Sequence, residues 1–245
     1  MKAMEAFAEL LPAFSTDEAL HEANRCLFCF DAPCIRACPT HIDIPAFIKK
    51  IATGNLHGSA RVILESNPLG ATCARVCPVD ELCEGACVLG PHHRPIPIGR
   101  LQRYAIDRLF ARDALTWKRG APRGRRAAIV GGGPAGLACA VRLLERGIDA
   151  TVFEARPRAG GLDTYGIVSF RLPVEVSLRE VELVERLGAE IRTGVRVGTD
   201  VDFESLVADF DAVFVGVGLG GTRGLGIPGE DLPGNLEGLA FIEAT

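Results

Sequence analysis

Apolar residues recur at helical spacing in the first half of the chain, in short stretches separated by loops. Residues 15–18, Ser-Thr-Asp-Glu, form a capping box that predicts the start of one helix. The segments 44–51 and 101–110 carry apolar residues three and four positions apart, which predicts two more helices. Strand patterns are largely missing before residue 115. The first part of the chain is therefore expected to be a helical domain.

The pattern changes after residues 118–126, where five lysine or arginine residues stand beside glycine and proline. Such a composition is typical of a linker. We therefore expect a helical domain over 1–117, a linker over 118–126 and a second domain over 127–245.

The second domain opens with the pattern of a dinucleotide fold. A short apolar run at 127–130 predicts a buried strand, and an apolar helix is expected over 137–146. The next strand, 151–154, ends in Glu154, about 20 residues past the glycines, where an acid binds the ribose hydroxyls of a dinucleotide. Glycines between the first strand and the helix permit a tight turn and close approach of a pyrophosphate. The residues of this turn are Gly131, Gly132, Gly133, Pro134, Ala135 and Gly136.

A second glycine-rich segment, 216–221, follows another predicted strand at 211–215. The residues after it are rich in glycine and proline, so no helix is expected to begin there. Without a helix N-terminus this segment lacks the amide groups and dipole of a phosphate site. Gly218 is instead expected to let the end of the strand pass close to a cofactor held by the first motif.

Composition and charge exclude several classes of protein. The 245 residues are 48% hydrophobic and 24% charged, enough for one or two domains with buried cores. Residues 1–15 hold only short apolar clusters broken by Lys2, Glu5 and Glu9, so no secretory signal peptide is expected. No apolar run approaches the roughly 20 residues of a membrane helix. A net charge of -4 gives no electrostatic reason to expect nucleic acid. We expect a cytoplasmic protein.

Eight of the nine cysteines precede residue 88 and fall into two runs, each with a Cys-Pro pair. A reducing cytoplasm favours metal ligation over disulfides. The spacing is similar to that of ferredoxin loops and predicts two iron–sulfur clusters. Structural zinc is the alternative, because short Cys-x2-4-Cys hooks also bind zinc. The first run is Cys26, Cys29, Cys34 and Cys38, and the second is Cys73, Cys77, Cys83 and Cys87.

With these motifs in this order, the chain resembles the iron–sulfur flavoprotein modules of dihydropyrimidine dehydrogenase and of the glutamate synthase small subunit. The resemblance covers nearly everything from Glu22 onward. The dihydropyrimidine dehydrogenase type, including the bacterial NAD-dependent small subunit, is the better match. The deciding motifs are Asp31-Ala-Pro-Cys34, Cys38-Pro-Thr40, Asn67-Pro-Leu-Gly70 and Ile98-Gly-Arg-Leu-Gln102.

The resemblance and simple counting disagree over one cluster ligand. Counting splits eight cysteines into two sets of four and makes Cys73 the eighth ligand. The resemblance instead implies the amide oxygen of Gln102, with Cys73 as a buried small side chain. It also implies that the cysteine before a proline serves the other cluster. The implied sets are Cys26, Cys29, Cys34 and Cys87 for one [4Fe-4S] cluster, and Cys38, Cys77, Cys83 and Gln102 for the other.

For the flavin, the resemblance implies contacts beyond the glycine turn. Gly161 and Leu162 match a segment beside the flavin, and Arg171 matches a cofactor-contacting arginine. Val197 and Val76 match further contact positions, and Val76 would bring a cluster loop against the flavin. The implied fold is an all-α domain with two [4Fe-4S] clusters, followed by an incomplete α/β Rossmann-like FAD-binding domain.

The chain departs from the family after residue 245, where the relatives continue with a nicotinamide-binding domain. NAD(P)H is therefore expected to act through a missing domain or a partner. The function implied is an electron-input module that passes electrons from FAD through two clusters to a partner subunit. Two alternatives stay open: a glutamate synthase or ferredoxin-linked oxidoreductase subunit, and a non-catalytic truncated cluster-binding module.

Overall fold

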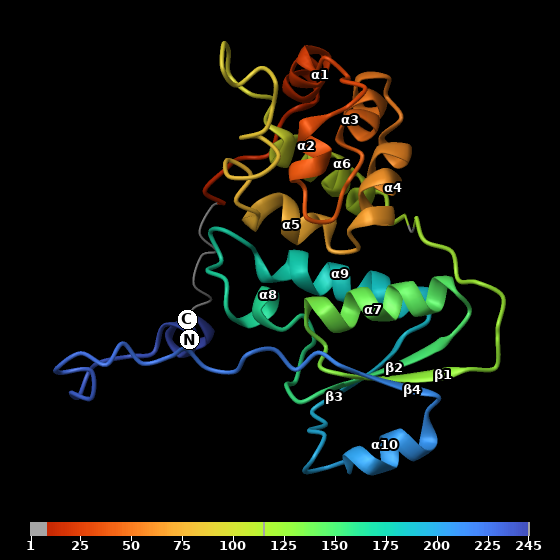
Figure 1. The fold of residues 1–245 in the computed structure, drawn as a ribbon, viewed down its shortest axis with the longest axis vertical. Coiled ribbons are helices and arrows are strands. Elements are labelled where there is room, and N and C mark those ends of the chain that lie inside the picture. The colour runs from red at the N-terminus through yellow and green to blue at the C-terminus, as the bar shows by residue number, and fades with distance from the viewer. Residues whose placement is uncertain (1–8, 115, 245) are drawn as a thin grey trace. The chain divides into compact units, whose positions relative to one another are not determined.

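The computed structural model describes residues 9–114 and 116–244 (Figure 1). These residues fall into two compact units that divide between Gly120 and Ala121. The sequence-based statement on a signal peptide concerns residues 1–15, of which the first eight lie outside the described part. None of the described helices is long and apolar enough to cross a membrane.

The N-terminal unit is built from short helices, and the described residues before Gly120 contain no strand. The capping box at Ser15 and Glu18 starts the first helix as the sequence predicts. Asp43 caps the third helix by accepting a hydrogen bond from the Ala46 amide. The helices are α1 (Thr16–Arg25), α2 (Pro33–Ala37), α3 (Ile44–Ala52), α4 (Leu56–Ser66), α5 (Gly70–Val76) and α6 (Ile98–Ala111).

Helix α6 begins three residues earlier than the sequence predicts, at Ile98. The reason is a cap supplied from another segment. The carboxylate of Glu84 accepts a hydrogen bond of 2.9 Å from the Gly99 amide, which would otherwise be an unpaired group of the first turn. No local pattern reveals a cap that lies 15 residues away.

The core of this unit lies where α3, α4 and α6 meet. Phe47 and Ile51 of α3 are fully buried there, as are Ile63 of α4 and Ile106 of α6. The buried Ser59 hydroxyl donates to the Phe47 carbonyl over 2.9 Å, so α4 also joins α3 through a polar contact. The cysteine-bearing loops lead into α3 and α6, so this core fixes where those loops end.

A buried ion-pair network joins α5 to α6. Arg75, with a side chain 5% exposed, lies between Cys73 and Cys77 and pairs with both Asp107 (2.9 Å) and Glu9 (3.3 Å). Arg103 contacts the same two carboxylates. Each charge therefore has partners of the opposite sign.

Replacing Arg75 with methionine is expected to lower the free energy of unfolding by about 2 to 3 kcal/mol, because two carboxylates then share one arginine in a poorly hydrated site. Urea unfolding measures the change. Arg61→Met is the control, since Arg61 forms an exposed i,i+4 pair with Glu65 that contributes less than about 0.5 kcal/mol. Equal losses in the two variants would contradict the role given to the network.

The C-terminal unit is a four-stranded parallel sheet with helices on both faces. The strand order is β3-β2-β1-β4, so the first strand lies inside the sheet. Helices α7 and α9 cover one face, and α10 lies on the other (Figure 1). The elements are β1 (Arg126–Val130), α7 (Pro134–Glu145), β2 (Asp149–Glu154), α8 (Leu162–Tyr165), α9 (Val174–Leu187), β3 (Glu190–Thr193), α10 (Phe203–Asp209), β4 (Ala212–Val215) and α11 (Gly238–Ala244).

Helix α7 begins at Pro134, inside the glycine turn and three residues before the predicted start. Proline suits the first turn of a helix, because its fixed φ matches and its missing amide hydrogen would have no partner there. The glycine turn and the helix N-terminus are thus one structure. After β4 the structure describes no helix before α11, in line with the expectation that segment 216–221 opens none.

Candidate cofactor sites

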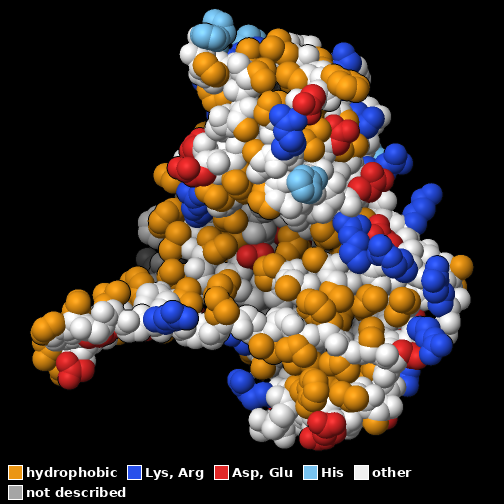
Figure 2. Space-filling model, viewed as in Figure 1, with side chains coloured by type: hydrophobic (Ala, Val, Ile, Leu, Met, Phe, Trp, Pro, Cys, Tyr) orange, Lys and Arg blue, Asp and Glu red, His pale blue; other side chains and the backbone are white. Residues whose placement is uncertain are grey.

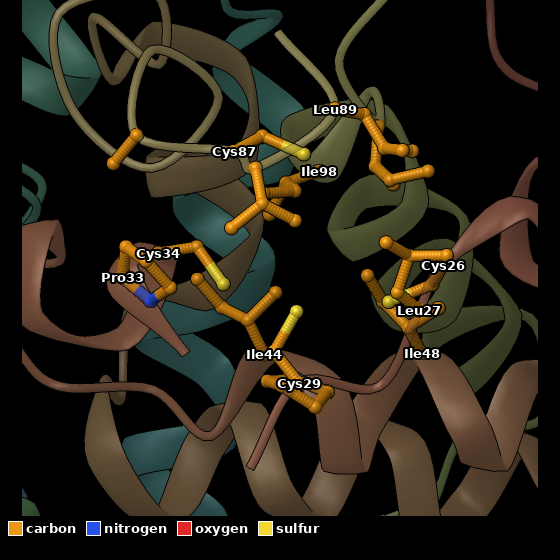
Figure 3. Close-up of a pocket in the computed structure, with 14 residues that line it drawn as sticks. Cys26, Leu27, Cys29, Pro33, Cys34, Ile44, Ile48, Cys87, Leu89 and Ile98 are labelled. Carbon is orange, nitrogen blue, oxygen red and sulfur yellow. The ribbon is translucent and has the colours of Figure 1, made fainter. Parts of the chain in front are cut away.

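Four cysteines from both runs surround one cavity in the N-terminal unit (Figure 3). Cys26 ends α1, Cys29 lies in the following loop and Cys34 lies in α2. Cys87 comes from the second run, more than 50 residues away. The rest of the wall is apolar and includes Ile44, Ile48 and Ile98.

The four thiols lie close enough to affect one another's ionisation. Burial, together with negative charge on Cys26 and Cys87, raises the pKa of Cys34 to about 11. Burial also raises the pKa of Cys26, with contributions from Cys29 and Cys87. These thiols do not ionise readily without a cation nearby. A bound metal deprotonates its cysteine ligands, so these sites are suited to a metal.

The loop between Cys26 and Cys29 contains a strained backbone. Phe28 has a φ of 50°, a left-handed conformation that is uncommon outside glycine. The Lys49 ammonium lies 4.6 Å from the centre of the Phe28 ring and helps to hold it. His41, near Cys38, has a φ of 52°. Strained residues of this kind collect at functional sites, and the sequence pattern contained no sign of them.

A second cavity gathers Cys38 of the first run with three cysteines of the second. Cys38 and Cys83 are buried, and Cys73 and Cys77 are half-buried. Burial, with contributions from Cys77 and Cys38, raises the pKa of Cys73 to about 12. Each cavity therefore combines cysteines of both runs. Cys87 of the second run lies at the first cavity, and Cys38 of the first run lies at the second.

Gln102 lines this second cavity together with Cys73, so both candidates for the eighth ligand lie there. The Gln102 side chain is buried, and its amide nitrogen donates to the Gly70 carbonyl over 2.9 Å. That bond helps to fix the orientation of the amide group and uses its nitrogen rather than its oxygen.

Among the described residues, no three histidine, cysteine or acidic side chains meet closely enough to hold a single metal ion. Each cysteine set instead surrounds a cavity. A four-iron cluster takes one thiolate on each iron, so its ligands stand around a volume and share no common point.

The C-terminal unit contains a larger cavity of about 730 Å³ at the carboxyl ends of its strands. This edge of a parallel sheet is where dinucleotides bind. The wall also includes residues of α11 and the segment after β4. Of the residues predicted from the sequence, it contains Gly131, Gly133, Pro134, Ala135, Glu154, Gly161, Leu162 and Gly218.

Glu154 connects the end of β2 to the glycine turn. Its buried carboxylate accepts a hydrogen bond from the Gly132 amide and another from the Arg156 amide, each of 2.8 Å. Gly132 thus lies behind the cavity wall and helps to hold Glu154 in place. The acid is oriented before any ligand arrives.

Close packing and backbone conformation explain why glycine occupies positions 136 and 131. A Cβ atom on Gly136 would lie 1.9 Å from the Gly131 carbonyl oxygen, and Gly131 itself has a φ of 104°. Helix α7 can therefore approach the turn only because position 136 has no side chain. This geometry brings backbone amides to the cavity, as a pyrophosphate requires.

Three predicted flavin contacts lie outside this cavity. Arg171 is exposed and does not line it. Val197 bridges to Val201 and packs against the core that includes Val130 and Phe153. Val76 is half-buried in the N-terminal unit, directly before Cys77. Their roles stay predictions based on resemblance.

Asp163 lines the dinucleotide cavity and was missed by the sequence patterns. Burial raises the pKa of its carboxyl from 3.8 to about 6. The raised pKa means that the charged form opposes folding: the cost is absent below about pH 4, grows up to about pH 6 and stays constant above that.

Asp163→Asn is therefore expected to stabilise the cofactor-free chain above pH 6, by about 1 to 2 kcal/mol after allowance for partial solvent screening. Near pH 4 the variant and the wild type are expected to unfold alike. Urea unfolding at pH 4 and pH 7.5 measures this, with the exposed Asp231→Asn as control. A stabilisation independent of pH would contradict the explanation.

Comparison with protein families gives two matches. Residues 3–114 match the family described as dihydropyrimidine dehydrogenase domain II, 4Fe-4S cluster. Residues 129–174 match the NAD(P)-binding Rossmann-like domain. The two matches fall on the cysteine cavities and on the glycine turn, respectively.

Curated relatives cover nearly the whole chain. The glutamate synthase [NADPH] small chain of Escherichia coli (strain K12) is 38% identical over 98% of this chain. The NAD-dependent dihydropyrimidine dehydrogenase subunit PreT of the same organism is 42% identical over 89%. The alignments cover 51% and 53% of those relatives, so the chain spans about half their length. The homologues of this chain therefore include the glutamate synthase small chain and the NAD-dependent dihydropyrimidine dehydrogenase subunit, and its residues 3–114 belong to the dihydropyrimidine dehydrogenase 4Fe-4S domain family.

Proposed function

We propose that this chain is an electron-input module that holds two [4Fe-4S] clusters and FAD and delivers electrons to a partner subunit. The observation that carries the proposal is the pair of cysteine-lined cavities, each of which draws thiols from both runs. The dinucleotide cavity of the C-terminal unit supplies the site for FAD.

The proposed ligands of the first cluster are Cys26, Cys29, Cys34 and Cys87, the four cysteines of the first cavity. For the second cluster we propose Cys38, Cys77, Cys83 and the oxygen of Gln102. The bond from the Gln102 amide nitrogen to Gly70 supports this choice, because it engages the nitrogen and not the oxygen that would bind the metal. An amide oxygen in place of a thiolate removes one negative charge and changes the reduction potential.

The proposed FAD site rests on the glycine turn. The amides at the start of α7 bind the pyrophosphate, and Glu154 accepts hydrogen bonds from the adenosine ribose. Gly161, Leu162 and Gly218 form walls of the cavity, and Arg171, Val197 and Val76 are further contacts proposed from the resemblance. When bound, FAD accepts two electrons as a hydride and releases them singly.

Reduction of the flavin requires a nicotinamide site, which we have not assigned to the described residues. We propose that a nicotinamide reduces the flavin through another domain or a partner, in the cytoplasm. Dihydropyrimidine dehydrogenase-type partners are favoured by the motifs around Cys34 and Gln102. The glutamate synthase type remains the second candidate, because that relative aligns with 98% of the chain.

Metal and flavin analysis of anaerobically purified protein tests the proposal. About eight irons, about eight sulfides and one FAD per chain are expected. Stoichiometric zinc without sulfide would overturn the cluster assignment. Clusters without flavin would favour a non-catalytic cluster-binding module.

A further inference from the structure

Large apolar side chains are exposed on the loops that carry the first cysteine set. Leu27 lies between Cys26 and Cys29 and is 60% exposed, and Phe30 directly after Cys29 is fully exposed. Val88, directly after Cys87, is 43% exposed. Exposed apolar groups cost free energy in water unless a partner covers them.

Two of these three side chains lie at the first cavity itself. Leu27 and Val88 are part of its wall, and Figure 3 shows Leu27 beside Cys26. The second cavity differs: among the described residues, no exposed large apolar side chain directly adjoins its cysteines, and Cys38 and Cys83 are buried. Within the described part of the chain, the first cysteine set thus differs from the second in having exposed apolar side chains next to it.

A basic hollow adjoins this surface. It measures about 420 Å³ and is lined by His21, Arg25, Leu89, His93 and Arg94. Leu89 lines the first cavity as well, so the hollow and the cavity share one wall residue. Figure 2 shows histidine and hydrophobic side chains gathered at the α1 end of this unit.

The charges around the hollow favour an acidic partner. The buried Glu22 pairs with both Arg25 and Arg94, which leaves one positive charge in excess. Asp31, next to Phe30, is paired with Arg36 and adds no net charge. An apolar centre with a positive rim complements a surface of negative charge.

We propose that an acidic one-electron carrier docks on this face, formed by Leu27, Phe30, Val88 and the basic hollow. The inference rests on the proposed function and adds the place where electrons leave the chain. The cluster that Cys26, Cys29, Cys34 and Cys87 would hold would supply one electron to the oxidised carrier, so that the cluster would be oxidised by one electron and the carrier reduced by one. No atom or proton is transferred.

Binding is tested with the full chain and an acidic two-cluster ferredoxin as the probe, both oxidised, by titration calorimetry. Iron and sulfide contents of every variant are measured first. Phe30→Ser is expected to raise the dissociation constant about tenfold, because one large apolar contact is lost. His93→Glu is expected to raise it several-fold at low salt and less at high salt. Leu225→Ser, in the other unit and 77% exposed, is the control and should bind like the wild type.

The outcomes separate the two proposals. A wild-type chain that holds its clusters but does not bind the ferredoxin, or a Phe30→Ser chain that binds it unchanged, would overturn the docking face and leave the proposed function standing. Self-association abolished by Phe30→Ser would identify a second copy as the occupant and also overturn it. A wild-type chain without iron or sulfide would overturn both.

Discussion

Cys34→Ser is expected to remove one cluster, and Cys38→Ser is expected to remove the other. The two cysteines are only four residues apart, but Cys34 faces the first cavity and Cys38 faces the second. Each variant should lose about four of eight irons, because serine binds iron weakly in place of a thiolate. Iron analysis and electron paramagnetic resonance of the reduced chains measure the loss and identify the missing cluster.

Cys73→Ser is the matched control for these variants. Cys73 lines the second cavity but is proposed as a non-ligand, so both resonance signals should persist. Gln102→Leu should alter only the signal that Cys38→Ser removes. Loss of that signal in Cys73→Ser would return the eighth position to Cys73. Loss of the same cluster in Cys34→Ser and Cys38→Ser would contradict the assignment of cysteines from both runs to each cluster.

Gly136→Ala is expected to abolish FAD binding and to lower the free energy of unfolding by about 3 kcal/mol. The added Cβ would lie 1.9 Å from the Gly131 carbonyl oxygen, so α7 must move away from the glycine turn. That movement displaces the amides that bind the pyrophosphate. Flavin content and urea unfolding measure the two effects.

Gly238→Ala provides the comparison, because a Cβ there meets no atom within 4 Å and α11 favours alanine. This variant should keep its flavin and its stability. If Gly136→Ala retained full flavin, the close approach of turn and helix would not be needed for binding. The cluster signals of both variants should be unchanged, since these glycines belong to the C-terminal unit.

Local patterns in the sequence predicted several elements of both units, but they did not predict α4, α9 or β3. The capping box at Ser15 starts α1, and the strand, glycine turn, helix and second strand follow one another from β1 to β2. These features depend on neighbours within a few residues, which a sequence displays directly. The starts of α6 and α7 were predicted less accurately. The start of α6 at Ile98 depends on the distant Glu84 carboxylate, and the start of α7 at Pro134 lies inside a turn that the pattern treated as separate.

The sequence by itself determined that this chain has cysteines in two runs and a glycine turn followed by an acid, because chemistry and spacing are local properties. Spacing along the chain does not reveal which thiols face the same cavity: the resemblance implied the two sets, and the tertiary structure shows two cavities lined by those cysteines. Packing of α3, α4 and α6 brings Cys87 to Cys26 and Cys38 to Cys83, contacts between residues far apart along the chain. Only the tertiary structure shows that Phe30 is exposed and that Asp163 is partly buried, since burial depends on every element packed nearby.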